Sequence, residues 1–281
     1  MQGGEFCIGR RNSGKNEFYY LLLFGKREKI MIPKVIHYCW FGKQPMPELV
    51  QNCVKSWEKY CPDYQIKLWN EDNIDVSGNR FMKEAYDAKK WAFVADVARL
   101  QTIYSEGGVY LDTDVELIKS LDPLLAHPAF FGMEDSGCVA MGLGFGAEKN
   151  NSLIKSFLDY YNDRRFLKFN GRFNKTPSPM IQTKIMQDMG FVKENKLQFF
   201  KGAAIYPSEY FCPKSYATGL CNITDNTYSI HHYDGSWKSS KEKKRAQDKR
   251  LIVAKYGKHK GKLVWRFIRI KEQIKHIWQN S

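Results

Sequence analysis

The stretch that decides the fold runs from Trp91 to Glu116 and reads WAFVADVARLQTIYSEGGVYLDTDVE. Apolar residues recur through its first part at the spacing of a helix face, which predicts a largely buried helix. Gly107 and Gly108 end that helix, because glycine takes the left-handed cap conformation without steric penalty. The apolar triplet 109–111 then predicts a short buried strand, and two aspartates follow where that strand leaves the core.

Asp112 and Asp114 stand one residue apart at this predicted strand end. Two carboxylates so placed can share one hard divalent cation, which prefers oxygen ligands and can hold a diphosphate at the same time. In an open α/β sheet, ligands bind outside the carboxyl ends of the strands. A bare D-x-D also occurs by chance in solvated turns. Here, however, the preceding apolar helix carries Asp96 and Arg99 on one face, and buried charges need a partner or a function.

These residues resemble a known family. The run ADVARLQTIYSEGGVYLDTD, which ends at Asp114, is similar to the DXD-containing sugar transferases of glycosyltransferase family 32. That group includes bacterial capsular polysaccharide enzymes and yeast-type α-mannosyltransferase initiators, and it is distantly similar to the catalytic domain of glucosylating bacterial toxins. The family's opening motif, I-P-K-x-I-H-x-x-W-x-G, is matched from Ile32 to Gly42. The resemblance extends to about Trp237.

The resemblance implies an α/β fold class of the GT-A type, with a mixed, mainly parallel central sheet that binds a nucleotide sugar. We expect an N-terminal extension over 1–30, with Met31 a plausible start, the GT-A domain over 31–237, and a basic amphipathic tail over 238–281. Within the domain, the patterns also predict strands over 34–42, 65–69, 129–133 and 139–145, and extended segments over 203–207 and 209–211.

The resemblance also implies roles for the charged residues. Asp114 and His232 would ligate Mn²⁺ or Mg²⁺, while Asp112 would bind the ion through water or hold the ribose and the sugar. Asp96 and Arg99 would orient hydroxyl groups of the donor sugar. His231 and His232 are adjacent, so on a strand they point to opposite faces and at most one reaches the ion. Two ordinary half-buried histidines are the alternative interpretation.

Four further residues are predicted to contact the donor. Trp40 matches the toxin tryptophan that stacks on uracil, although a core tryptophan is the simpler interpretation of such a residue. Asn73 could touch the ribose or the base, or it could be a turn residue. Ser236 and Trp237 resemble the closing loop of the toxins, whose tryptophan contacts the diphosphate.

The charge of the chain is concentrated in its tail. The net charge is +14, and residues 238–281 hold 15 Lys and Arg against 3 Asp and Glu. Apolar residues interleave with these cations at Val264, Phe267, Ile268, Ile274, Ile277 and Trp278. This pattern predicts an amphipathic helix on an anionic membrane surface. A helix packed on the domain with a solvated basic face is the alternative, and nucleic acid is a weaker third because no recognition fold accompanies the charge.

Cysteine usage and hydropathy bound the cellular location. The seven cysteines are odd in number and contain no C-x-x-C pair, which favours reduced thiols. No apolar run reaches the roughly 18 residues of a membrane-spanning helix. We expect a cytoplasmic protein with peripheral contact to the inner face of the membrane.

Together these features predict a metal-dependent glycosyltransferase. The donor would be a nucleotide sugar, UDP-linked by resemblance, and the acceptor a saccharide or a lipid-linked saccharide in surface polysaccharide biosynthesis. The resemblance implies retention of the anomeric configuration. The competing interpretations are a non-catalytic protein that binds nucleotide sugars or carbohydrate, and a protein-glycosylating effector. As an enzyme, the chain is expected to keep its activity when the tail is deleted.

Overall fold

The computed structural model describes residues 32–235 and 240–279, apart from the side chains of residues 258, 273 and 275–279. The predicted extension over 1–30 and the predicted donor contacts Ser236 and Trp237 lie outside the described residues. The predicted domain boundaries therefore stay a prediction.

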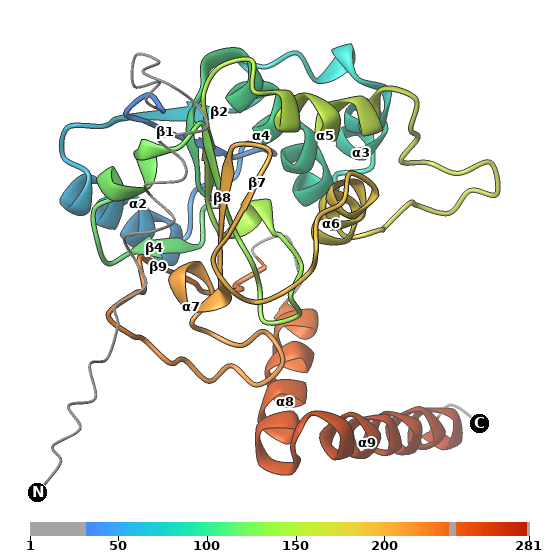
Figure 1. The fold of residues 1–281 in the computed structure, drawn as a ribbon. Coiled ribbons are helices and arrows are strands. Elements are labelled where there is room, and N and C mark those ends of the chain that lie inside the picture. The colour runs from blue at the N-terminus through green and yellow to red at the C-terminus, as the bar shows by residue number, and fades with distance from the viewer. Residues whose placement is uncertain (1–31, 236–239, 280–281) are drawn as a thin grey trace, which may run out of the picture. The chain divides into compact units, whose positions relative to one another are not determined.

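Within the described residues, seven strands form the central sheet in the order β2-β1-β3-β6-β5-β8-β7 (Figure 1). The strands are β1 (Val35–Cys39), β2 (Gln65–Trp69), β3 (Gly108–Tyr110), β5 (Ala129–Gly132), β6 (Phe145–Ala147), β7 (Gln198–Phe200) and β8 (Ala203–Tyr206). β2, β1 and β3 are parallel, as are β5 and β8, whereas β6 is antiparallel to both its neighbours and β7 to β8. The predicted α/β class with a mixed sheet and a parallel N-terminal half is confirmed.

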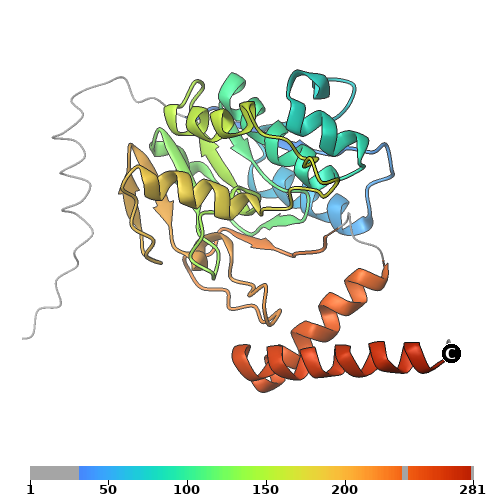
Figure 2. The same ribbon diagram turned by 90° about the vertical axis from the view of Figure 1, so that its right-hand side faces the viewer.

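Helices cover both faces of this sheet (Figures 1 and 2). One face carries α3 (Arg80–Asp87), α4 (Trp91–Glu106), α5 (Ser152–Asn162) and α6 (Ser178–Asp188). The other carries α2 (Glu48–Tyr60), α7 (Ser208–Phe211) and a two-stranded sheet of β4 (Val115–Leu117) and β9 (Ser229–His231). Three short 3₁₀ turns connect these elements: η1 (Val76–Gly78), η2 (Asp122–Ala126) and η3 (Met141–Leu143).

Two hydrophobic cores lie on opposite faces of the sheet, and β3 contributes to both. Tyr110 packs in the core beneath α3–α6, while Val109 and Leu111 pack in the core beneath α2 and α7. Successive side chains of a strand point to opposite faces, so a strand covered on both sides reads as a continuous apolar run. The predicted central helix is confirmed as α4, which ends at Gly107 with a φ of 72°.

Two predictions are wrong: the strand over 139–145 and the extended segment over 209–211. The segment 139–145 contains η3 rather than a strand, and β6 begins only at Phe145. The segment 209–211 belongs to α7, which begins after Pro207 at φ −64°. Both segments contain apolar residues, but a glycine or a proline determines their backbone conformation. Gly144 takes a φ of 116° just before β6, and a proline at φ near −65° is preorganised to start a helix.

The basic C-terminal region is helical, as predicted, but it contains two helices rather than one. α8 (Ser240–Tyr256) precedes α9 (Lys258–Gln279), and Gly257 at φ 79° separates them. A Cβ on Gly261 would lie 2.6 Å from the Cα of Val253, so α9 packs closely on α8 at this point. α8 was not predicted, because the charged run before Leu263 has no clear apolar periodicity.

Membrane-spanning helices and disulfide bonds were not expected from the composition. No helix there is both long enough and apolar enough to cross a bilayer. The six described cysteines are unbridged, and Cys39, Cys53, Cys61 and Cys212 are buried.

Candidate active site

The aspartate pair lies where β3 ends, beside the ends of two parallel strands. The N–H of Leu111 donates to the carbonyl of His37 in β1, and the N–H of Trp40 donates to the carbonyl of Trp69 in β2. The carboxyl ends of β1, β2 and β3 therefore meet at one edge of the sheet, which is where α/β proteins bind ligands.

The small sheet brings a histidine to the same place. β9 pairs antiparallel with β4, and the register sets His231 opposite Val115, the residue after Asp114. His231 Nε2 lies 3.0 Å from Asp114 Oδ1, and the N–H of Asp234 donates to Asp114 Oδ2 at 2.9 Å. One ligand atom from each of Asp112, Asp114 and His231 lies within 4.8 Å of the others. Two oxygens and one nitrogen thus converge on one point.

His231, and not His232, joins this cluster. His232 Nε2 lies 2.8 Å from Glu116 Oε2, on the other side of the strand. The alternation of side chains along β9 separates the two histidines, as expected, but the geometry selects the opposite member of the pair. The register of β9 on β4 determines which histidine faces Asp114, and the sequence pattern alone does not predict that register. Metal binding by either histidine stays a prediction.

The two carboxylates differ in their electrostatics. Burial raises the pKa of Asp112, although the guanidinium of Arg99 opposes this effect. Burial acts in the same direction on Asp114, but His231 and the N–H of Asp234 outweigh it and hold the pKa of Asp114 at about 2. Burial lowers the pKa of His231, yet the negative charge of Asp114 raises it above its usual value. Asp114 is therefore ionised at neutral pH and attracts positive charge.

Arg99 links α4 to this site from below. Its side chain is 5% exposed, and its guanidinium forms an ion pair with Asp96 and lies 3.5 Å from Asp112 Oδ1. Arg99 Nη2 also donates to Ser178 Oγ at 2.7 Å. Opposing its burial, Asp96 and Asp112 raise the pKa of Arg99, so the guanidinium stays charged. The structure thus brings together the predicted pair Asp96 and Arg99 with Asp112.

Two site residues were missed from the sequence, and each had a partial signal. Ser178 begins α6 in a segment, TPSPMIQT, that resembles the family's T-G-P-x-x-x-T with serine in place of glycine. Gly142 lies against Asp112, since a Cβ at Gly142 would be 2.4 Å from Asp112 Oδ2. The glycine-rich run around it predicts close backbone approach, but not to which residue.

Trp40 and Asn73 lie at the same edge of the sheet, but their hydrogen bonds go to backbone atoms nearby. The indole N–H of Trp40 donates to the carbonyl of Gln44 at 2.6 Å. Asn73 Nδ2 donates to the carbonyl of Leu68 at 2.8 Å, and Asn73 Oδ1 accepts the N–H of Asn70. Asn73 is therefore a turn residue here. Contact of either side chain with a nucleotide stays a prediction.

The residues present fit a divalent cation. His231 Nδ1 and Arg99 Nε are buried and have no hydrogen-bond partner among the described residues. Such orphaned polar atoms are rare. The imidazole nitrogen can ligate a cation, whereas the guanidinium N–H calls for an acceptor on a ligand or a water molecule. Carboxylates suit magnesium and manganese, and an imidazole shifts the preference toward a transition metal such as manganese.

Comparisons with known proteins agree with this geometry. Residues 47–131, which include both aspartates, match the family model described as "Glycosyltransferase sugar-binding region containing DXD motif". Inositol phosphoceramide mannosyltransferase 3 of Schizosaccharomyces pombe is 35% identical over 103 residues, which is 35% of this chain and 29% of the relative. An uncharacterized glycosyltransferase, L373, of Acanthamoeba polyphaga mimivirus is 26% identical over 215 residues, or 71% and 83% of the two chains.

Among solved structures, the PaToxG glycosyltransferase gives a TM-score of 0.43 at 18% identity, over 57% of this chain and 70% of its own. An active-site mutant of LgtC gives 0.40 at 13% identity, over 76% and 94%. The match spans about a third of the length of the two fission yeast mannosyltransferases with which it was compared. The matched region contains the aspartates of a D-x-D motif at positions 112 and 114, so this part of the chain is similar to glycosyltransferases whose sugar-binding region contains a DXD motif.

Proposed function

We propose that this chain is a metal-dependent glycosyltransferase that moves a sugar from a nucleotide sugar to a saccharide or lipid-linked saccharide. The observation that carries the proposal is the convergence of Asp112, Asp114 and His231 at the ends of the parallel strands. Asp96 and Arg99 lie directly beside this cluster. The family-model match over residues 47–131 supports the same reaction class. Only 29% and 34% of the two fission yeast relatives are matched, so the activity of the whole chain is our inference.

Asp112, Asp114 and His231 would hold the cation, Mn²⁺ in preference to Mg²⁺. A cation in this position supplies neutralisation of the negative charge that develops on the leaving diphosphate. Asp114, with its pKa near 2, keeps a full negative charge for that ion throughout the physiological range.

Asp96 and Arg99 would bind hydroxyl groups of the donor sugar. The guanidinium is held on three sides by Asp96, Asp112 and Ser178, which leaves it little freedom to reorient. A planar donor group fixed in this way binds hydroxyl oxygens at low entropic cost, and such positioning is a main source of enzymatic rate. Retention of the anomeric configuration, implied by the family resemblance, stays part of the proposal.

Two donors are considered, a UDP-sugar and a mannosyl donor. The resemblance to toxin domains favours a UDP-sugar, whereas several relatives are named mannosyltransferases and favour a mannosyl donor. The relatives that act on inositol phosphoceramide, by their names, support a glycolipid-like acceptor. A role in surface polysaccharide biosynthesis is consistent with a lipid-linked acceptor.

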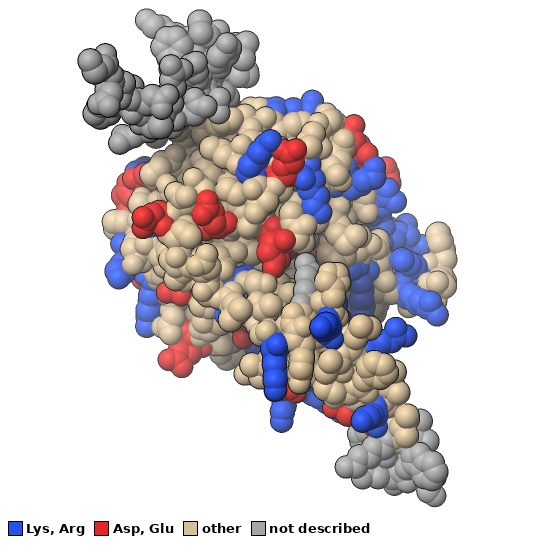
Figure 3. All heavy atoms as spheres, turned by 60° about the horizontal axis from the view of Figure 1, so that its bottom comes forward, with Lys and Arg blue, Asp and Glu red and all other residues tan. Residues whose placement is uncertain are grey.

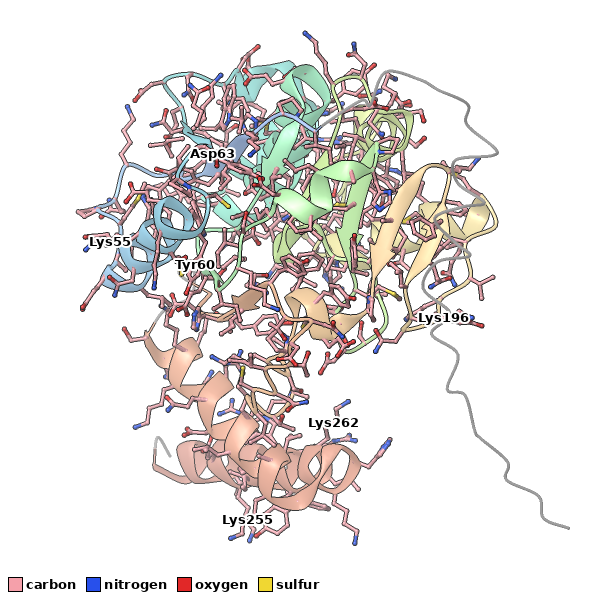
Figure 4. The ribbon with its side chains drawn as sticks, turned by 60° about the vertical axis from the view of Figure 1, so that its left-hand side comes forward. Lys55, Tyr60, Asp63, Lys196, Lys255 and Lys262 are labelled. Atoms are coloured by element: carbon pink, nitrogen blue, oxygen red, sulfur yellow. The ribbon has the colours of Figure 1, made fainter. Side chains whose placement is uncertain are left out.

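We infer that the protein acts at the cytoplasmic face of a membrane, which it contacts through α9. The apolar side chains of α9 that are exposed lie at intervals of four, three and four residues, so they share one helix face: Leu263 at 57%, Phe267 at 66%, Ile270 at 42% and Ile274 at 49%. Val264 and Ile268, predicted for that face, are instead half-buried. Lys255 and Lys262 are exposed on the two tail helices (Figure 4). Basic and apolar groups together favour an anionic bilayer.

Nucleotide release from a panel of UDP- and GDP-sugars tests this function. The full chain and its Asp114→Ala variant are each assayed with Mn²⁺ and without it. The proposal predicts metal-dependent release from one donor, with release by the variant reduced about 1000-fold, the scale seen when a group that stabilises developing charge is lost. A non-catalytic binding protein would instead bind a nucleotide sugar and release nothing. An unchanged rate in the variant would contradict the assignment of Asp114.

A further inference from the structure

Residues 231–235, called the closing segment from here on, carry His231 and Asp234 to Asp114 and have an unusual backbone. Tyr233 takes a φ of 56°, in the left-handed region that a tyrosine adopts only where its surroundings enforce it. This turn lets His231 and the N–H of Asp234 reach Asp114 from the same segment. The position of two groups at the aspartate thus depends on what holds Tyr233 and Asp234.

Part of the support comes from the body of the domain. The hydroxyl of Tyr233 lies 2.9 Å from Cys212 Sγ, and the ring of Tyr216 meets the ring of Tyr233 edge-on, with centroids 5.1 Å apart. The rings of His231 and Tyr233 are 4.1 Å apart. The Tyr233 side chain is therefore packed directly against the candidate metal ligand.

The rest of the support comes from α8. Lys243 Nζ lies 2.7 Å from Asp234 Oδ2. About two helical turns further along, Arg250 Nη2 lies 3.4 Å from the carbonyl oxygen of Tyr233, and Arg250 Nε donates to the carbonyl of Tyr216 at 3.2 Å. The guanidinium also lies over the Tyr216 ring, 5.3 Å from its centroid. Lys243 and Arg250 of α8 thus reach the residues that carry the turn.

The rest of α8 is mostly polar. Val253 is its buried apolar residue, and Gly261 of α9 packs on it. Leu251 is 63% exposed. The described contacts of α8 with the closing segment are therefore ionic and hydrogen-bonded, through Lys243 and Arg250. Lys243 and Arg250 thus make directed polar contacts with this segment, which a helix that only covers a hydrophobic face would not make.

We propose that α8 braces the closing segment, and that Lys243 and Arg250 are positioning residues for His231 and Asp114. The consequence of this brace rests on the proposed function: where the cluster binds a metal ion, the start of the basic tail is part of the metal site. It revises the expectation that activity survives loss of the tail. Neither residue touches the reacting atoms, and each acts through the turn at Tyr233 and Asp234.

Hydrogen exchange on the full chain tests the brace without reference to turnover. The variants are Lys243→Met, Arg250→Met and both together, with Lys244→Met, exposed on the same helix, as the matched control. A partly exposed ion pair contributes modestly, so we expect backbone amides of residues 229–235 to exchange about threefold faster in each single variant and about tenfold faster in the double variant. The control should match the wild type. Unchanged exchange in the double variant would overturn the proposal.

A charge exchange separates positioning from general stability. Lys243→Asp and Asp234→Lys should each raise the Mn²⁺ concentration that gives half-maximal nucleotide release, and the double exchange should restore most of the loss. The maximal rate at saturating Mn²⁺ should change by a smaller factor than the half-maximal concentration does. Equal half-maximal concentrations in all variants would contradict the brace. If no donor turns over in any variant, the proposed function fails, whereas the brace is still decided by hydrogen exchange.

Discussion

At the scale of single residues, the site depends on which of two adjacent histidines faces the aspartates. His231 lies 3.0 Å from Asp114 Oδ1, and His232 lies 2.8 Å from Glu116 Oε2. Both are hydrogen-bonded to a carboxylate, so composition and local environment do not distinguish them. Only the strand register does.

The two histidines make a matched pair of variants. His231→Ala removes a candidate ligand and should lower Mn²⁺ affinity about 100-fold, at the upper end of what loss of even an outer-shell partner costs. His232→Ala should change the affinity by less than about threefold, because Glu116 lies away from the cluster. Calorimetric titration with Mn²⁺ measures both. The reverse ranking would return the ligand role to His232.

A second residue-scale prediction concerns Gly142. A Cβ at this position would lie 2.4 Å from Asp112 Oδ2, so Gly142→Ala must displace the carboxylate. We expect Mn²⁺ affinity to fall about tenfold and the free energy of unfolding to fall by about 1–3 kcal/mol, the usual cost of overpacking. Gly78→Ala is the control, because its Cβ would meet only the Asp75 side chain, at 3.1 Å. Equal metal affinity in the two variants would show that Asp112 does not depend on Gly142.

At the scale of elements, His37 joins β1 to the turn between α4 and β3. His37 is fully buried, Trp69 Nε1 donates to its Nδ1 at 3.0 Å, and its Nε2 lies 2.9 Å from the carbonyl oxygen of Gly107. A ring that accepts at Nδ1 and donates at Nε2 is neutral. Burial lowers the pKa of His37 to about 4.

This pKa predicts an acid-sensitive fold. The folded state binds a proton at His37 less readily than the unfolded state, whose histidine titrates near pH 6.5, so its contribution to stability is complete above pH 6.5 and is lost as the pH falls to about 4. The total is about 3 kcal/mol. Chemical denaturation at pH 7 and pH 4.5 should show this loss in the wild type and a smaller one in His37→Gln. Equal pH slopes in the two proteins would contradict the assignment.

The elements also show what the sequence could and could not predict. α4, its end at Gly107, and β3 were predictable because each depends only on local sequence. A long run with helical apolar spacing forms the helix, two glycines end it, and an apolar triplet forms the strand. Asp112 and Asp114 followed from their position at the strand end. His231 and Ser178 were not predictable, because their roles depend on the β4–β9 register and on where α6 begins, and both are set by tertiary packing. α8 lacks an apolar period and was missed for that reason.

At the scale of the whole molecule, charge divides the chain into a nearly neutral body and a basic tail. On the face shown in Figure 3, acidic and basic side chains are interspersed over much of the body. Residues 238–281 carry 15 of the 44 Lys and Arg. The tail therefore has two separate roles in this account: α8 contacts the closing segment, and the exposed face of α9 is available to a membrane.

The membrane role predicts binding to vesicles that contain phosphatidylglycerol and not to neutral vesicles. Binding should weaken steeply between 50 and 300 mM salt, because exposed charges are screened over about 10 Å at 0.1 M. Phe267→Ser should lower partitioning about tenfold, the loss expected for one buried aromatic side chain. Leu220→Ser, equally exposed but outside the tail, should have no effect. Equal sedimentation of both variants with the vesicles would place the membrane contact elsewhere.

Asp112, Asp114 and His231 are proposed to hold a metal ion together with a nucleoside diphosphate. The most direct test is the electron paramagnetic resonance of Mn²⁺, titrated with the full chain in the presence of UDP or GDP. We expect the signal of free Mn²⁺ to disappear with one ion bound per chain, the nucleotide to tighten this binding, and Asp114→Ala to abolish it. Equal loss of signal in the wild type and Asp114→Ala, or no binding in either, would contradict the account.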